Sequence, residues 1–227
     1  MQVKLISYSK PSRELANEGL YDVQELITYC ARVSNPSNQF SLESSEKLIK
    51  YLVKHQHWSP LEMVSACLEV TTTRDIARQM LRHRSFSFQE FSQRYADPTK
   101  DLDFVLREAR LQDIKNRQNS IELDFGIAGQ RQLAYQWENM QKRVIEAAKE
   151  AYTWAIEHGI AKEQARAVLP EGNTVSRLYM NGTLRSWIHY IQTRSANGTQ
   201  KEHIEIAKAC AGVIAEIFPL TPQFVSE

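Results

Sequence analysis

The sequence predicts an α+β fold, in which a few strands accompany long helices. Apolar residues recur at helical spacing over several long segments, most clearly over residues 129–158. Shorter segments rich in β-branched and apolar residues are typical of strands. The two kinds of element do not alternate as βαβ units do, so a doubly wound parallel sheet is not expected.

The bulk composition is that of an ordinary globular protein. The 227 residues are 42% hydrophobic and 24% charged, and we predict a single domain over residues 1–227. A net charge of +1 gives no drive towards non-specific binding of nucleic acid or membrane, so neither is expected as a partner. No apolar run reaches about 18 residues and the start is no signal peptide, which predicts a reducing cytoplasm.

The cysteines predict neither a disulfide framework nor a metal site. Cys30, Cys67 and Cys210 are far apart and odd in number, and none belongs to a Cys-x-x-Cys pair. His55 and His57 lack a third ligand at a sensible spacing, so no metal is expected. We interpret the three thiols as buried and inert.

The first half of the chain predicts strands and helices in turn. Residues 3–8 and 62–73 read as strands, and residues 74–83 as a helix. Between the strands, helical spacing covers residues 23–33 and 43–55. A side chain at Ser41 or Ser44 is a candidate cap for the second of these helices.

The second half opens with the least regular segment, residues 97–128, which contains the polar patch 113–120. A connection of this length is usually functional or ordered by a partner, and the patch is either a surface loop or part of a site or interface. The remaining elements are a long helix over 129–158, a short one over 162–168, a strand over 174–180 and helices over 184–194 and 201–218.

Residues 82–94, RHRSFSFQEFSQR, carry the strongest functional signal. Three arginines, a histidine and a glutamate stand among three phenylalanines. Arginine offers a planar fork of donors suited to phosphate, and phenylalanine a hydrophobic wall, which favours a pocket for a flat phosphorylated ligand such as a nucleotide. The alternative is that the cations simply stabilise a helix C-terminus.

The helix predicted before this run and the turn within it add further polar groups. On the predicted helix 74–83, Arg78, Gln79 and Arg82 can share one face, and the Gln79 amide can pair with a pyrimidine edge. Glu90, Ser92 and Arg94 are expected on a loop or turn after it, with Arg94 as a second fork for phosphate or carboxylate.

Arg185 and His189 lie four residues apart on one helix, whereas Arg194 is two and a half turns from Arg185 and points to the other side. Together with Arg166, these side chains therefore serve either two ligands or two sites of an oligomer. Rossmann, P-loop and Gly-x-Ser-x-Gly motifs are all absent.

The motifs together resemble the flavin-dependent thymidylate synthase, or ThyX, family over residues 3–218. The resemblance rests on an Arg-His-Arg-x7-Ser-x-Arg signature over residues 82–94 and on four supporting motifs. These are Ala77-Arg78-Gln79, His57-x-Ser59-Pro60-x-Glu62, Ala165-Arg166-x-x-Leu169-Pro170 and Leu184-Arg185-Ser186-Trp187-x-His189-Tyr190-x-x-x-Arg194.

The resemblance implies that dUMP is converted to dTMP with 5,10-methylenetetrahydrofolate as carbon donor. FAD, reduced by NADPH, is implied as the hydride source, with no cysteine nucleophile. It further implies a ThyX-like fold with a central, mostly antiparallel sheet flanked by long helices, and a homotetramer with shared active sites. Arg185 and His189 would then serve flavin, and Arg194 the nucleotide.

Family roles carry over residue by residue. Arg194 resembles the catalytic residue that holds the uracil in its reactive, N3-deprotonated form, and His57 a residue near the flavin and folate entrance. The implied dUMP contacts are Gln79, Arg82, Glu90, Phe91, Ser92, Gln93, Arg94, Arg166 and Arg194. The implied FAD contacts are Ser34, Ser59, Glu62, Arg82, His83, Arg84, Glu90, Thr183, Arg185 and His189.

The sequence departs from other members at Gln93, where a glycine is common, and at Gln89 and His189, where some have asparagine. Side-chain contacts at Gln93 and His189 therefore stay open. Two other functions are also compatible with the motifs. One is a sensor of dUMP or FAD without turnover, and the other is an RNA-binding module that stacks bases on the Arg/Phe run.

Overall fold

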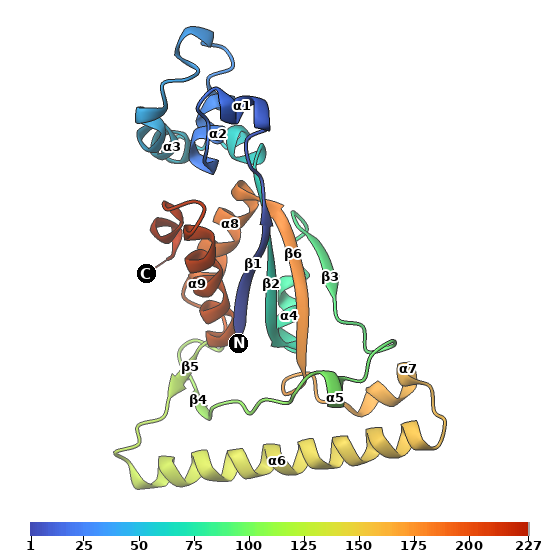
Figure 1. The fold of residues 1–227 in the computed structure, drawn as a ribbon. Coiled ribbons are helices and arrows are strands. Elements are labelled where there is room, and N and C mark those ends of the chain that lie inside the picture. Colours follow the sequence, from blue (N-terminus) through green and yellow to red (C-terminus); the bar gives the residue numbers. More distant parts are fainter. Residues whose placement is uncertain (227) are drawn as a thin grey trace.

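A four-stranded antiparallel sheet forms the centre of the computed structural model, which describes residues 1–226 (Figure 1). The strand order is β1-β2-β6-β3, and every neighbouring pair is antiparallel. This confirms the predicted α+β class and the antiparallel sheet. The strands are β1 (Gln2–Tyr8), β2 (Ser65–Thr73), β3 (Ser87–Glu90) and β6 (Val175–Thr183).

Only one face of this sheet is buried. Alternate residues of β2 and β6, such as Leu68 and its partner Met180, are fully buried and belong to the main core. The residues between them on β6, such as Arg177 and Tyr179, are exposed. Successive side chains of a strand point to opposite faces, so the helices cover one face and leave the other open.

Three helices contribute buried residues to the same core: α4 (Arg74–Met80), α8 (Leu184–Ser195) and α9 (Lys201–Ala215). Trp187 of α8 is fully buried against the sheet, where its indole Nε1 donates to the carbonyl oxygen of Ala66 at 3.0 Å. A buried indole needs such an acceptor, so this bond fixes α8 on β2.

A group of smaller helices lies beyond the upper end of the sheet in Figure 1. It contains α1 (Arg13–Asn17), α2 (Val23–Ala31) and α3 (Ser45–Lys54). Asp22 and Glu25 form a capping box at the start of α2. Ser44 occupies the N-cap position of α3, yet its hydroxyl donates to the Ser41 carbonyl oxygen instead of capping the helix.

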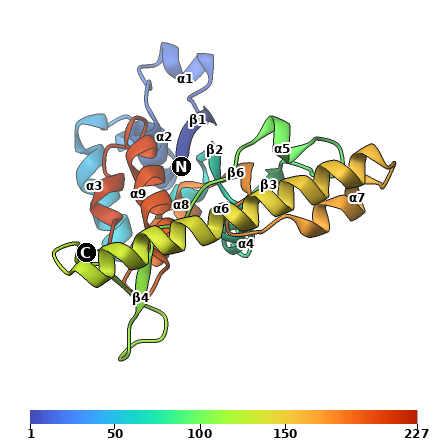
Figure 2. The same ribbon diagram turned by 90° about the horizontal axis from the view of Figure 1, so that it is seen from below.

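The long helix α6 (Ala128–Glu157) crosses the lower end of the molecule in Figure 1. Helix α7 (Lys162–Ala165) lies alongside its C-terminal part (Figure 2). Among residues 1–226, no helix combines the length and the apolar character needed to cross a membrane. The remaining elements are α5 (Pro98–Asp101), strands β4 (Arg110–Gln112) and β5 (Ser120–Glu122), and 3₁₀ turns at Pro36–Asn38, Leu42–Ser44, Ser59–Glu62, Arg166–Val168 and Thr221–Phe224.

Several predicted boundaries were wrong for local reasons. The strand predicted over 62–73 begins only at Ser65, because Pro60 starts a 3₁₀ turn before it. The helix predicted over 74–83 ends at Met80, and the strand predicted over 174–180 continues to Thr183. Glu90, expected on a loop, ends strand β3, which pairs with β6 at the sheet edge.

The irregular segment 97–128 contains a hairpin of β4 and β5 whose connection is the polar patch 113–120. Asp113 closes this connection by accepting from the backbone nitrogens of Lys115 and Asn116, a side-chain turn typical of aspartate. The patch therefore forms a hairpin tip, and Asn119 joins it to Asn197 at 3.3 Å.

Candidate functional site

The last turn of α8 contacts the turn that follows α4. This brings Arg194 next to the Arg-His-Arg part of the signature. Arg194 donates from Nε to Nε2 of His83 at 2.8 Å, and the His83 ring lies edge-on to Tyr190. Burial, aided by the charges of Arg194 and Arg82, lowers the pKa of His83 to about 4. His83 is therefore neutral near pH 7, and its ring nitrogen can accept from the guanidinium.

The first phenylalanine of residues 82–94, Phe86, packs in the core. Phe86 is buried and packs edge-on against Trp187, with ring centroids 4.8 Å apart. A Cβ placed on Gly182 would approach the Phe86 ring to 2.4 Å, so only glycine leaves room for it. Phe86 therefore belongs to the core and does not wall the pocket expected from the sequence.

Gln79 faces α9, away from the solvent-exposed Arg78. Its Nε2 donates to Oε1 of Gln200 at 2.9 Å, and its Oε1 lies 3.1 Å from Nδ1 of His203. Arg78 instead pairs with Glu171 at 3.5 Å. The prediction that Arg78, Gln79 and Arg82 share a helix face was wrong, because α4 ends at Met80 and Arg82 lies beyond it.

A second cluster surrounds the start of α8. Thr183 caps the helix by accepting from the backbone nitrogen of Ser186, and its hydroxyl lies 3.2 Å from Glu62 Oε2. Arg185 pairs with the same carboxylate. One turn later, His189 packs edge-on against Trp58 at 4.5 Å, and burial followed by the Arg185 charge lowers its pKa. Arg185 and His189 thus share a side of α8, as predicted.

Glu90 ends β3 inside an ion pair that the sequence did not reveal. Its Oε1 accepts from the Ser176 hydroxyl at 2.8 Å and lies 3.6 Å from Nη1 of Arg74. Arg74 is only 7% exposed and also reaches Glu171 at 3.4 Å. A partly buried carboxylate held by a charge and a hydroxyl is positioned firmly, which suits a residue that must orient a ligand.

The turn after β3 carries the rest of the signature. Ser92 accepts from the backbone nitrogen of Arg94, and Gln93 is 4% exposed. Within residues 1–226, Nε2 of Gln93 has no hydrogen-bond partner. Arg94 pairs with the Glu163 side chain at 3.3 Å, and Arg166 donates from Nε to the Glu163 carbonyl oxygen. Arg94 and Arg166 thus gather at α7, whereas Arg194 contacts His83.

The other predicted contacts lie at the surface. Arg82 and Arg84 are exposed in the turn between α4 and β3, and Ser59 and His57 are exposed next to Trp58. Phe91 is half-buried and its backbone nitrogen donates to the Arg177 carbonyl oxygen at 2.8 Å. Ser34 is exposed on the rim of a cavity of about 490 Å³ between α2 and α3.

These groups suit an anionic, flat ligand and a flavin with its phosphates. Exposed guanidiniums at Arg82 and Arg84 are available for phosphate, and the orphaned Nε of Arg185 is a buried donor that lacks a partner within residues 1–226. Among the same residues, no group of three His, Cys, Asp or Glu side chains could hold a metal ion.

The thiols do not form a nucleophilic site in the described part of the chain. Cys210 is fully buried, whereas Cys30 and Cys67 are only half-buried, contrary to the expectation that all three are buried. Burial raises the pKa of each, so the reactive thiolate is disfavoured.

Sequence reasoning missed a polar network beside Gln79. It contains His203, Gln200 and Glu202 at the start of α9, together with Arg107 and Arg110 from the irregular segment. The residues come from segments about 90 positions apart in the chain, and no local spacing connects them. Their polar character at the start of a helix reads as an ordinary solvated turn.

Comparison with known proteins gives one consistent result. A family model described as "Thymidylate synthase complementing protein" matches residues 18–220. The chain is 46% identical over 219 residues to a probable flavin-dependent thymidylate synthase of Paramecium bursaria Chlorella virus 1, covering 96% of both chains. It is 47% identical over 220 residues to the flavin-dependent thymidylate synthase of Synechocystis sp., again covering 96% of both.

A solved structure has the same fold. A UMP/dUMP methylase, PolB from Streptomyces cacaoi, determined with bound 5-Br UMP, superposes with a TM-score of 0.77 at 26% identity. The superposition covers 98% of this chain and 92% of that one. The family model and both relatives match nearly the whole chain, and on these grounds the chain belongs to the family of flavin-dependent thymidylate synthases.

Proposed function

We propose that this flavin-dependent thymidylate synthase methylates dUMP to dTMP with 5,10-methylenetetrahydrofolate as carbon donor and NADPH as reductant. When bound, FAD supplies the hydride that completes the methyl group. The contact between Arg194 and His83 carries the proposal, because it joins the nucleotide and flavin halves of the motif set at one place. The uracil nucleotide bound to the similar Streptomyces protein supports a pyrimidine substrate.

Arg194 is the proposed catalytic residue for dUMP. A guanidinium stays charged at every working pH and stabilises negative charge that develops on the uracil ring. In the structure Arg194 is half-buried and tied to a neutral histidine, which orients the fork without cancelling its charge. The other proposed dUMP contacts are Gln79, Arg82, Glu90, Phe91, Ser92, Gln93, Arg94 and Arg166.

The proposed flavin contacts combine the α8 start with the exposed turn after α4. Arg82 and Arg84 would meet the phosphates. Glu62, which accepts from the Thr183 hydroxyl, holds Arg185 in place. His57, exposed beside Trp58, would stand at the folate entrance. The complete proposed set is Ser34, Ser59, Glu62, Arg82, His83, Arg84, Glu90, Thr183, Arg185 and His189.

We further propose that the chain acts as a single domain and assembles as a homotetramer with shared sites. Arg166 lies at the Arg166–Val168 turn beside Glu163 and Arg94, whereas Arg194 lies on α8 against His83. A second copy is one way for both arginines to meet one nucleotide. The exposed apolar side chains of α6 provide a surface for such a copy.

The test is dTMP formation by the FAD-loaded protein and its Arg194→Ala variant. We expect turnover to fall by roughly 10²–10³-fold, because a preorganised charge on the reacting ring is lost. FAD absorbance should stay near that of the wild type. Arg78→Ala, which removes an exposed arginine paired with Glu171, should retain normal turnover. An Arg194→Ala protein that makes dTMP at the wild-type rate would refute the role of Arg194.

A further inference from the structure

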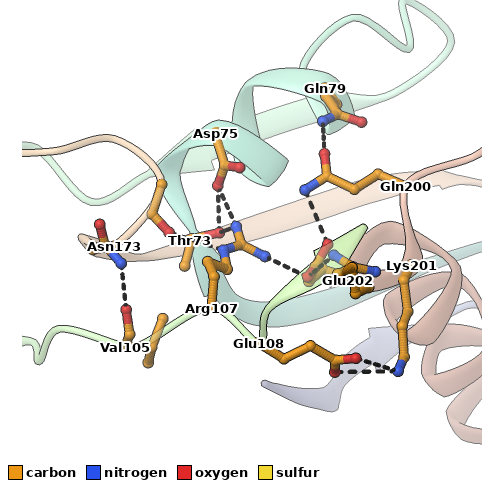
Figure 3. A network of polar contacts seen from close by, with 12 residues as sticks. Thr73, Asp75, Gln79, Val105, Arg107, Glu108, Asn173, Gln200, Lys201 and Glu202 are labelled. Carbon is orange, nitrogen blue, oxygen red and sulfur yellow. Dashed lines mark hydrogen bonds and ion pairs between the residues drawn. The ribbon is translucent and has the colours of Figure 1, made fainter. Parts of the chain in front are cut away.

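Five side chains form a continuous hydrogen-bond chain beside the proposed nucleotide site. It runs from Tyr190 through His203, Gln79 and Gln200 to Glu202. Figure 3 shows its final part, where the Gln79 and Gln200 amides face each other and Gln200 reaches Glu202. Tyr190, His203 and Glu202 are each less than a tenth exposed, so water competes little for these groups.

Glu202 determines the order of donors and acceptors along these five side chains. Burial alone would raise the pKa of this carboxyl, but the hydrogen bond from Arg110 and the charge of Arg107 outweigh burial and lower it. An ionised carboxylate only accepts hydrogen bonds, so Gln200 must present its NH₂ group to Glu202. That bond measures 2.9 Å from Nε2 to Oε2.

Each later orientation follows from this one. Gln200 then has only its carbonyl oxygen for Gln79, which must answer with its own NH₂ group at 2.9 Å. The Gln79 carbonyl oxygen faces Nδ1 of His203, which must carry the proton. Nε2 of His203 is left as an acceptor for the Tyr190 hydroxyl at 3.1 Å.

We propose that Glu202 and His203 are positioning residues that fix which edge of the Gln79 amide faces dUMP. The inference rests on the proposed role of Gln79 as a dUMP contact. With both inner bonds made, the amide retains one N–H and one oxygen lone pair for a ligand. The free N–H suits a ring carbonyl oxygen, as in uracil, whereas a flipped amide would suit the amino group of cytosine.

The irregular segment 97–128 contributes two arginines that contact Glu202. Arg110 donates to Glu202 Oε1 at 2.5 Å, and Arg107 lies 3.3 Å from the same atom. Arg107 is held in turn by Asp75 at 2.6 Å (Figure 3). The two arginines keep Glu202 ionised and in place. They therefore stabilise the order of donors and acceptors in the hydrogen-bonded series from Glu202 to Tyr190.

The experiment is a double-mutant cycle on dUMP binding to the FAD-loaded protein. Single variants His203→Phe and Gln79→Ala and their combination are titrated with dUMP and with dCMP. We expect His203→Phe to weaken dUMP binding about tenfold, because the half-buried Gln79 amide loses one of the two bonds that hold its orientation and its carbonyl oxygen loses its donor. The preference for dUMP over dCMP should fall as well, which a general loss of packing would not cause. In the Gln79→Ala background, His203→Phe should have no further effect.

The outcomes separate the possible failures. Unchanged dUMP binding or unchanged nucleotide preference in His203→Phe would overturn the positioning role, and so would effects that simply add to those of Gln79→Ala. If Gln79→Ala itself binds dUMP normally, the proposed contact at Gln79 is wrong and the inference falls with it, while the Arg194→Ala test is unaffected.

Two further variants complete the design. Lys201 lies at the start of the same helix and pairs with Glu108 and Glu122, which are not part of the hydrogen-bonded series. Lys201→Gln removes this charge and should leave dUMP binding within about twofold of the wild type. Glu202→Gln replaces His203→Phe if the latter fails to hold FAD. An amide at position 202 can donate as well as accept, so the orientation of Gln200 and Gln79 is no longer set. The same nucleotide preference should fall, and an unchanged preference would again overturn the inference.

Discussion

Helices α6 and α9 are both amphipathic, yet they differ in what covers their apolar side. Ile206, Cys210 and Ile214 of α9 are essentially fully buried against the sheet and α8. On α6, Leu133 is 42% exposed, Met140 55% and Val144 53%. The buried residues of α6 begin at its middle, with Gln141, Ile145 and Ala148. Towards its C-terminus, Tyr152 and Ala155 pack with Ala165 and Leu169.

The difference shows that apolar spacing predicts a helix but does not specify its partner. A buried stripe contributes to the stability of its own chain, whereas an exposed stripe of this size is typical of an interaction surface. The α6 stripe is defined here as Leu133, Trp137, Met140 and Val144. If a second copy covers it, its contribution depends on protein concentration, and that of α9 does not.

The largest expected effect comes from placing a charge on the α6 stripe. Met140→Glu should dissociate the proposed assembly, because a carboxylate buried in an apolar interface costs several kcal/mol. Analytical ultracentrifugation should then show a particle near the chain mass of 26.2 kDa. Turnover should fall about a hundredfold, because groups from another copy would no longer be held in place.

The matched control is Lys142→Glu, which adds a carboxylate to the same helix away from the stripe. Lys142 is about half exposed and pairs with Glu138. This variant should keep the wild-type mass and activity. Equal dissociation in both variants would mean that net charge, and not the stripe, governs assembly.

A smaller effect is expected from truncating one residue on each helix. Ile214→Ala should lower the free energy of unfolding by about 3 kcal/mol at any protein concentration, because it leaves a cavity in the core. Val144→Ala should matter only where the protein is assembled. Urea unfolding at two protein concentrations checks both, and a concentration-independent loss at Val144 would place it in a core of its own chain.

The smallest effect concerns pH and rests mainly on His203 of α9. Burial, followed by the charge of Arg194 and by His83, lowers the pKa of the fully buried His203 to about 3, against 6.5 for an ordinary histidine. Between these values the unfolded chain binds more protons. The free energy of unfolding should therefore fall by about 2 kcal/mol for this group from pH 7 to pH 5. His83, with a lowered pKa of about 4, acts in the same direction.

Urea unfolding at the two pH values measures this loss. His203→Phe should shrink the difference between pH 7 and pH 5, because the titrating group is gone. A variant with the same pH dependence as the wild type would show that folding does not shift the pKa of His203.

Local patterns were enough to predict the fold class and most helices. The spacing over residues 129–158 predicted α6 to within one residue at each end, and the opening strand was predicted to within one residue. Strand β3 was missed because four residues rich in polar side chains carry no strand pattern. Its pairing with β6 creates the element, and that contact spans roughly 90 positions of the chain.

The candidate site was predictable only in part, and for the same reason. Residues such as Arg194 and His83 stand in motifs, and the structure brings these two into contact. Other motif residues are positioned by partners that belong to no motif. Arg74 holds Glu90, and His203 holds Gln79. Their roles depend on which distant side chain faces them, and single-chain spacing does not contain that information.

Gln141, at the middle of α6, is bonded to the backbone of Arg107 in both directions. Its Oε1 accepts from the Arg107 nitrogen at 2.8 Å, and its Nε2 donates to the Arg107 oxygen at 2.9 Å. This pairing imitates one rung of an antiparallel ladder, and Gln141 is only 4% exposed. These two bonds hold residue 107 against the helix. A second copy that docks on α6 would therefore contact the helix that holds Arg107, whose guanidinium lies 3.3 Å from the Glu202 carboxylate.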